Sequence, residues 1–181
     1  MKLVMVRHMT TDFNARGILQ GRRDIPILDP GPLDLEKIQA NLITIRAQEG
    51  AGYDHVLTSR LKRTQMTADL YGYASQMEPL ADELDFGPYE GRPRQTLLAE
   101  QPLWINRPDQ VELGESLSDL KKRVTGFCQK YQACARVLVF GHGAWIRGLV
   151  SCVRTGSIQR MNQMDLPNNQ VVVLDIEKGQ F

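Results

Sequence analysis

The chain has 181 residues, of which 42% are hydrophobic and 24% are charged. This composition is typical of a globular domain and excludes a disordered chain. There are 22 Lys and Arg residues against 21 Asp and Glu residues, a net charge of +1, so the overall charge gives no reason to expect binding to nucleic acid or to an anionic membrane.

Apolar runs alternate with helical patterns along the chain. The runs are short and partly β-branched, which predicts strands, whereas the helical patterns repeat apolar residues every three or four positions. In chain order we predict a strand over 2–6, a helix over 34–48, a strand over 53–58, helices over 61–73 and 116–131, a strand over 137–140, a helix over 144–153 and a strand over 171–176. This alternation predicts an α/β fold with a mostly parallel sheet.

Two stretches interrupt the pattern and are expected to be loops. Residues 20–33 contain three prolines and two glycines, and residues 86–114 contain four of the nine prolines. Long loops in a compact domain are usually functional or mobile, so 86–114 is either a cover over a substrate site or a surface excursion. Because we find no repeat or linker, we expect one domain over 1–181.

The cysteines and the N-terminal segment indicate the cellular compartment in which the protein is expected. Cys128, Cys134 and Cys152 are odd in number and lack a Cys-x-x-Cys spacing, which argues against a disulfide framework and a cysteine zinc site. The apolar run 3–6 is too short for a signal peptide or a membrane span. We therefore expect a soluble, reduced, cytoplasmic protein with no membrane partner.

Two of the three histidines directly follow predicted strands. Arg7 and His8 follow the first strand, and His142 and Gly143 lie between the third strand and the helix after it. Ligands of open parallel sheets bind beyond the carboxyl ends of the strands, and a helix start exposes amides that attract anions. Either histidine alone could be a packed core residue, but two in equivalent places favour a shared anion site. His55 lies inside a predicted strand and receives no role.

Two further residues are candidates near the same edge. Arg63 lies in the first turns of the predicted helix 61–73, where it could fork onto phosphate oxygens or be solvated. Glu83 lies in an acidic segment before a Gly/Pro loop, where it could act as a general acid and base or be a polar loop residue. The neighbouring Asp82 and Asp85 compete for that role.

An ordered series of motifs makes the chain resemble the histidine phosphatase superfamily, the phosphoglycerate-mutase-like proteins, over nearly its whole length. The matching segments are RHMTTDFN at 7–14, QGRRDIPI at 20–27, TSRLKRTQMTA at 58–68, LADELDFGPYEG at 80–91, Gly114-Glu115-Ser116 with Arg123, and HGAWIR at 142–147. The branch that it resembles most is that of the α-ribazole and broad-specificity phosphatases. The resemblance implies a three-layer α/β/α sandwich.

The resemblance also implies roles for particular residues. It makes His8 a nucleophile that forms a phosphohistidine, and Glu83 the general acid and base. The groups implied around the phosphoryl oxygens are Arg7, Arg63 and His142 with Asn14, and the further phosphate-binding positions are Gln20, Gly21 and Gly143. This chemistry needs no metal and no cofactor. A rival metal site of two histidines and one carboxylate, formed by His8, His142 and Glu83, is disfavoured because two neighbouring arginines would repel a dication.

Two residues depart from the family pattern. Met9 stands where the family usually has glycine, and it either narrows the floor of the pocket or points away from it. Arg60 stands where the family usually has proline. Neither change removes a residue that the resemblance assigns to catalysis, but both bear on which substrate is accepted.

The resemblance implies a metal-independent phosphomonoesterase acting on a small phosphorylated metabolite. A mutase is the first alternative, which the short chain disfavours, and a non-enzymatic phospholigand-binding protein is the second. Four arginines of the two loop stretches could contact a second anionic group of the substrate or be solvated: Arg22, Arg23, Arg92 and Arg94. The sequence predicts no oligomeric state.

Overall fold

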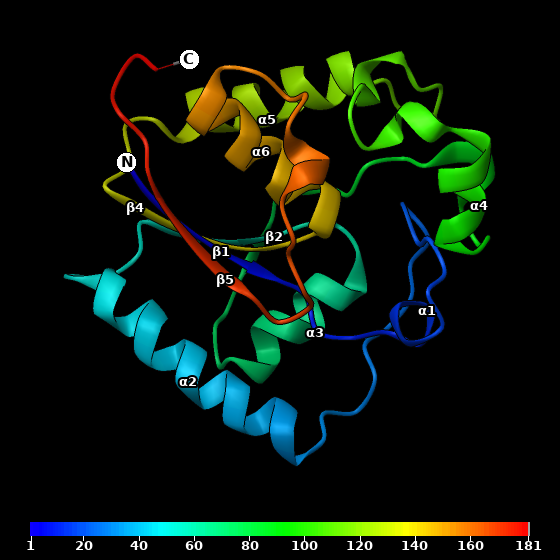
Figure 1. The fold of residues 1–181 in the computed structure, drawn as a ribbon. Helices are drawn as coiled ribbons and strands as arrows, with labels where there is room; N and C mark the ends of the chain where they lie inside the picture. The colour runs from blue at the N-terminus through cyan, green and yellow to red at the C-terminus, as the bar shows by residue number, and fades with distance from the viewer. Residues whose placement is uncertain (181) are drawn as a thin grey trace.

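The computed structural model describes residues 1–180 and contains a five-stranded sheet in the order β3-β2-β4-β1-β5 (Figure 1). The strands are β1 (Lys2–Arg7), β2 (His55–Thr58), β3 (Gln76–Met77), β4 (Arg136–Gly141) and β5 (Val171–Asp175). The first four are parallel to their neighbours, and β5 runs antiparallel to β1 at the edge. The predicted mostly parallel sheet is therefore confirmed, with β3 as an unpredicted short edge strand.

Helices cover both faces of the sheet. They are α1 (Asp12–Ala15), α2 (Pro32–Glu49), α3 (Lys62–Leu70), α4 (Arg94–Glu100), α5 (Leu117–Tyr131) and α6 (Gly143–Thr155). Figure 1 shows α5 and α6 on one face, and α2 and α3 on the other. This arrangement confirms the three-layer α/β/α sandwich.

Alternation along the buried strands divides the core into two clusters. Leu3 and Met5 of β1 pack in the cluster that contains the apolar faces of α5 and α6. Val4 and Val6 pack in the cluster that contains the buried residues of α2. Because successive side chains of a strand point to opposite faces, a strand buried on both sides is apolar at every position.

The expectation that 86–114 is a loop is wrong in part. This stretch contains α4 and three short 3₁₀ helices at Gly87–Tyr89, Pro102–Trp104 and Pro108–Gln110. The prolines start the 3₁₀ helices, because proline is favoured at the first helical positions, where its missing N–H is not needed. Residues 20–33 have no regular element before α2 begins at Pro32. No helix within residues 1–180 is both long enough and apolar enough to span a membrane.

Candidate active site

A cavity of about 270 Å³ lies at the carboxyl edge of the parallel strands. Among its lining residues are Arg7 and His8 at the end of β1, Arg63 at the start of α3, and Gly143 at the start of α6. Asn14, Gln20, Gly21 and Glu83 line the same cavity. His142 is fully buried, and its ring centroid lies 5.3 Å from that of His8. The fold thus brings the predicted site residues to one place.

His8 is buried where β1 ends, and within residues 1–180 one of its ring nitrogens has no hydrogen-bond partner. Its Nδ1 lies 2.7 Å from the carbonyl oxygen of Met9, which only accepts, so Nδ1 carries the proton and Nε2 keeps a lone pair. Burial, followed by the charges of Arg63 and Arg7, holds the pKa of His8 well below its usual value of 6.5. His8 is therefore a neutral imidazole at physiological pH.

The structure shows whether the Met9 side chain narrows the floor of the cavity or points away from it. Its side chain is buried in the same core cluster as Val4 and Val6, and it does not line the cavity. The backbone amide of Met9 donates to Thr67 Oγ1 over 3.0 Å. The methionine therefore points into the core and leaves the floor of the cavity open.

His142 and Arg63 form one buried hydrogen-bonded unit. Arg63 Nε donates to His142 Nδ1 over 3.2 Å, so the proton of His142 lies on Nε2 and is donated to Ser59 Oγ at 2.7 Å. Arg63 also donates to the carbonyl oxygens of Arg23 and Gly21. Burial lowers the pKa of Arg63 to about 10, which leaves the guanidinium charged at neutral pH. Three of its five N–H groups are used, and two remain for a ligand.

Two more donors face the cavity with unused hydrogen-bonding capacity. Nη1 of Arg7 donates to the carbonyl oxygen of Leu166, while its Nε is buried and has no partner within residues 1–180. Asn14 Oδ1 accepts from Thr11 and from Asn168 Nδ2, which directs its own amide group away from these partners. Both side chains are suited to bind an anion.

Glu83 occupies the N-terminus of α6. Its carboxylate accepts from the amides of Ala144 and Trp145 at 3.1 and 3.0 Å, and from Leu84 at 2.9 Å. The sequence predicts free amides at this helix start, but the structure shows two of them bound to Glu83. Gly143 lines the cavity, and its amide has no acceptor within residues 1–180.

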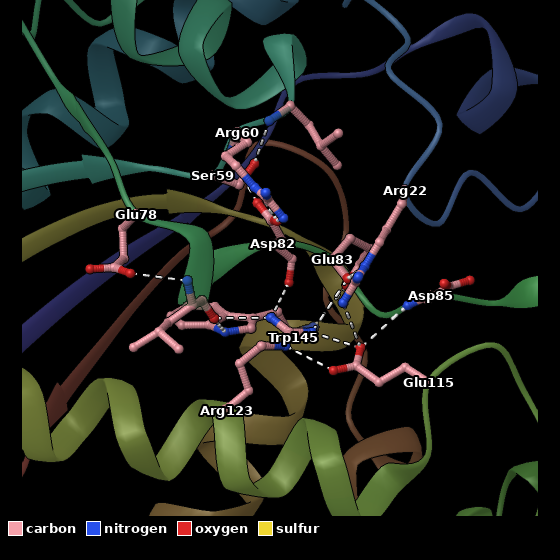
Figure 2. Close-up of polar contacts among 12 residues, drawn as sticks. Arg22, Ser59, Arg60, Glu78, Asp82, Glu83, Asp85, Glu115, Arg123 and Trp145 are labelled. Atoms are coloured by element: carbon pink, nitrogen blue, oxygen red, sulfur yellow. Dashed lines mark hydrogen bonds and ion pairs between the residues drawn. The ribbon is translucent and has the colours of Figure 1, made fainter.

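A network of polar contacts fixes the backbone on both sides of Glu83 (Figure 2). The guanidinium of Arg123 donates to the carbonyl oxygens of Leu80, Asp82 and Glu83 at 2.9, 2.5 and 3.4 Å. It also binds both carboxylate oxygens of Glu115 at 2.8 Å. The segment that carries Glu83 is therefore held by a helix that begins more than thirty residues later, at Leu117.

Neither competing aspartate lines the cavity. The carboxylate of Asp82 accepts three hydrogen bonds from Arg60, including one from its backbone amide. Arg60 stands where the family usually has proline, and its ion pair with Asp82 lies outside the cavity. Asp85 Oδ1 accepts from the amide of Gly87 at 2.8 Å.

A model of the histidine phosphatase superfamily (branch 1) matches residues 3–181 of the sequence. The chain belongs to the histidine phosphatase superfamily. It is an enzyme of the histidine phosphatase type.

Known relatives carry names from both activities of this superfamily. The chain is 31% identical over 166 residues to the "Probable phosphoglycerate mutase GpmB" of Cronobacter sakazakii, covering 84% of this chain and 74% of the relative. It superposes on the α-ribazole phosphatase of Shigella flexneri with a TM-score of 0.76 and 25% identity, over 100% of this chain and 93% of that one. A mycobacterial glucosyl-3-phosphoglycerate phosphatase has the same fold, with a TM-score of 0.77 and 20% identity over 96% and 92% of the two chains.

The sequence gives the four loop arginines the same possible role of binding a second anionic group. The structure shows that their surroundings differ. Arg22 pairs with Glu115, Arg23 donates to the carbonyl oxygen of Glu90, and Arg92 pairs with Glu100. Arg94 is the one member of the four that lines the cavity.

Sequence reasoning missed Arg147, which also lines the cavity of the histidine phosphatase. The signal was present in HGAWIR, because residues four apart lie on one face of a helix and Arg147 follows Gly143 by four. Within residues 1–180 no group of three or more His, Cys, Asp or Glu side chains is arranged to hold a metal ion.

Proposed function

We propose that this histidine phosphatase hydrolyses the phosphate monoester of a small molecule through a phosphohistidine on His8. The observation that carries the proposal is the state of His8: a buried, neutral imidazole with Nδ1 tied to a carbonyl oxygen and Nε2 free. A nucleophile must be unprotonated at the attacking atom, and this arrangement supplies it without a separate base.

The first half-reaction transfers the phosphoryl group to the enzyme. His8 Nε2 forms a bond to phosphorus as the bond between phosphorus and the leaving oxygen breaks. Glu83, in its protonated form, gives its proton to the leaving alkoxide, which departs as an alcohol. The guanidinium groups of Arg7 and Arg63 and the amide of Asn14 stabilise the charge on the phosphoryl oxygens, because donors that are already fixed need no reorganisation.

The second half-reaction returns the enzyme to its starting state. Water attacks phosphorus and Glu83, now a carboxylate, takes a proton from it. The bond between phosphorus and His8 Nε2 breaks, and inorganic phosphate leaves. Because Glu83 serves once as acid and once as base, one carboxyl group is sufficient for the whole cycle.

We favour hydrolysis over mutase chemistry because the chain superposes on the α-ribazole phosphatase of S. flexneri over 100% of its length at 25% identity. Transfer to a second acceptor would require that water be excluded from the phosphoenzyme.

Assays with p-nitrophenyl phosphate in the presence of a chelator test the proposal. We expect turnover that resists chelation, and an acid-labile, alkali-stable phosphoenzyme that disappears together with activity in His8→Ala. Activity that survives His8→Ala, or that chelators abolish and zinc restores, would refute the phosphohistidine. Interconversion of 2- and 3-phosphoglycerate faster than release of phosphate would assign the mutase reaction instead.

A further inference from the structure

The cavity extends beyond the groups assigned to the phosphoryl group. On this side it is lined by Arg94 at the start of α4, Arg147 on α6, and Trp104 and Asn162. None of these residues has a role in the two half-reactions proposed above. They line the part of the cavity that is left for the rest of a substrate.

Arg147 is held with its head group beside that of Arg7. A Cβ atom built on Gly143 would lie 3.3 Å from Arg147 Nη1 and 3.3 Å from Arg7 Nε, so the two guanidinium groups flank the same glycine. Arg147 Nη2 donates to Asn162 Oδ1 over 3.3 Å, and Asn162 Nδ2 in turn donates to the carbonyl oxygen of Trp104. Asn162 therefore positions the guanidinium of Arg147.

The arginines on this side have unused hydrogen-bonding capacity. Nε of Arg147 is buried without a partner within residues 1–180. The side chain of Arg94 is exposed, and within the same residues it makes no hydrogen bond or ion pair. Arg92, two residues away, shows the contrast, because its guanidinium is paired with Glu100. Arg147 and Arg94 are thus left with donors that only a ligand or solvent can satisfy.

Positive charge exceeds negative charge in the cavity. Burial lowers the pKa of Arg147 to about 10; the charge of Glu83 opposes this shift, and the charges of Arg7 and Arg94 act in the same direction as burial. Among the described residues, the carboxylates that line the cavity are Glu83, which is bound to α6 amides, and Asp165, which is exposed and forms no ion pair. Clustered buried cations cost free energy unless an anion pairs with them.

We propose that Arg147 and Arg94 form a second anion subsite, which binds a carboxylate or second phosphate carried by the substrate. The inference rests on the proposed function and names its substrate class: small phosphomonoesters with another anionic group. The first subsite takes the phosphoryl group on Arg7 and Arg63, and the second takes the other anion across Gly143. A guanidinium fork is suited to both carboxylate and phosphate oxygens.

Two esters that differ in one group test the subsite. 3-Phosphoglycerate carries a carboxylate where glycerol 3-phosphate carries a hydroxymethyl group. We expect the wild-type enzyme to have a higher kcat/KM for 3-phosphoglycerate. Arg147→Gln should lower the ratio of the two kcat/KM values by about ten- to a hundredfold, the usual effect of one charge-assisted hydrogen bond. Arg94→Gln should lower it less, because Arg94 is exposed.

Arg92→Gln is the matched control, because it removes an equally basic side chain that is paired outside the cavity. It should leave the ratio unchanged. A wild-type enzyme that does not distinguish the two esters, or an Arg147→Gln enzyme with the wild-type ratio, would overturn the subsite while p-nitrophenyl phosphate turnover still supports the proposed function.

Calorimetry tests the subsite separately from turnover. With His8→Ala protein, which cannot form the phosphoenzyme, 3-phosphoglycerate should bind more tightly than glycerol 3-phosphate. The difference should shrink in the double variant His8→Ala, Arg147→Gln. If neither ester nor the aryl phosphate is hydrolysed, the proposed function fails, and these binding constants still decide the subsite: equal affinities for the two esters would reject it.

Discussion

His8 and His142 have neighbouring rings, yet their hydrogen bonds select different tautomers. The proton of His8 lies on Nδ1, so Nε2 is available for attack. His142 accepts from Arg63 on Nδ1 and donates to Ser59 from Nε2, so both of its nitrogens are bound to the protein. In this arrangement His142 contributes by orienting Arg63. Its direct contact with a phosphoryl oxygen stays a prediction.

Replacement of Glu83 by glutamine tests the proposed role of this single residue as general acid and base. An alkoxide leaving group needs a proton, whereas an aryl leaving group needs little assistance. We therefore expect Glu83→Gln to lower kcat/KM for an alkyl phosphate by about 10²–10⁴-fold, the usual contribution of a positioned acid or base, and to affect an aryl phosphate less. Rates with glycerol phosphate and p-nitrophenyl phosphate measure the difference.

Asp82→Asn and Asp85→Asn are the controls, because both carboxylates are hydrogen-bonded within the protein and lie outside the cavity. They should not produce a loss selective for the alkyl ester. A small, equal loss for Glu83→Gln with both substrates, together with a large selective loss for one aspartate variant, would move the role to that aspartate.

Between elements, α5 and α6 together place the segment that carries Glu83. The amides at the start of α6 receive its carboxylate, and Arg123 of α5 binds the carbonyl oxygens around it. Glu115 neutralises Arg123 in a largely buried pair, with 10% and 13% of the two side chains exposed. We infer that Arg123 is a positioning residue that acts on the reaction through Glu83.

Arg123→Met should therefore reproduce the signature of Glu83→Gln in weaker form. We expect the loss of kcat to be larger for glycerol phosphate than for p-nitrophenyl phosphate, since displacement of the general acid matters most for the poorer leaving group. Breaking the buried pair should also lower the free energy of unfolding by about 3–5 kcal/mol. Kinetics are measured at a temperature where the variant remains folded by circular dichroism.

Arg123→Lys separates positioning from simple destabilisation. Lysine keeps the charge beside Glu115 but lacks the planar fork that reaches several carbonyl oxygens at once. It should recover more of the stability than of the alkyl-to-aryl rate ratio. If Arg123→Met lowers stability while that ratio stays at the wild-type value, the role of Arg123 is structural alone.

For the whole molecule, the two buried neutral histidines couple folding to pH. Burial is the largest cause that holds the pKa of His8 and of His142 well below 6.5, and the charge of Arg63 follows. Below about pH 6.5 the unfolded chain therefore binds more protons at these positions than the folded chain does. Stability must rise with pH through this window and fall on acidification, by about 1.4 kcal/mol per pH unit for each histidine.

Urea unfolding at pH 7.5 and pH 5.5, in buffers without phosphate, measures this dependence. We expect the free energy of unfolding to be about 2–3 kcal/mol lower at pH 5.5. His8→Gln and His142→Gln should each remove about half of the decrease, whereas Asn14→Ala, which keeps both histidines, should retain it. Equal stability at the two pH values would contradict neutral burial of these rings.

The positions of the site residues along the chain follow from local pattern. The spacing of apolar residues predicts where the strands lie and where the helices begin. These predicted elements place His8 and His142 at the ends of strands. In a parallel sheet those ends share one edge, so the meeting of the two histidines needed no knowledge of side-chain packing. The ordered motifs indicated the superfamily, because each retained residue types that phosphoryl transfer requires at a fixed place in the chain.

Only the tertiary structure decided which groups are already paired. Nothing local distinguishes Arg94 from Arg92, or shows that Glu83 binds amides of a helix that begins sixty residues later. The structure of residues 86–114 was also decided by tertiary contacts. Their prolines indicate a loop, but Leu97 and Trp104 are buried in the main core, and the stretch forms α4 and 3₁₀ helices. Periodicity reports which face of an element is apolar. The partner of a charge depends instead on which surfaces meet in the folded chain, and burial then makes an unpaired charge costly.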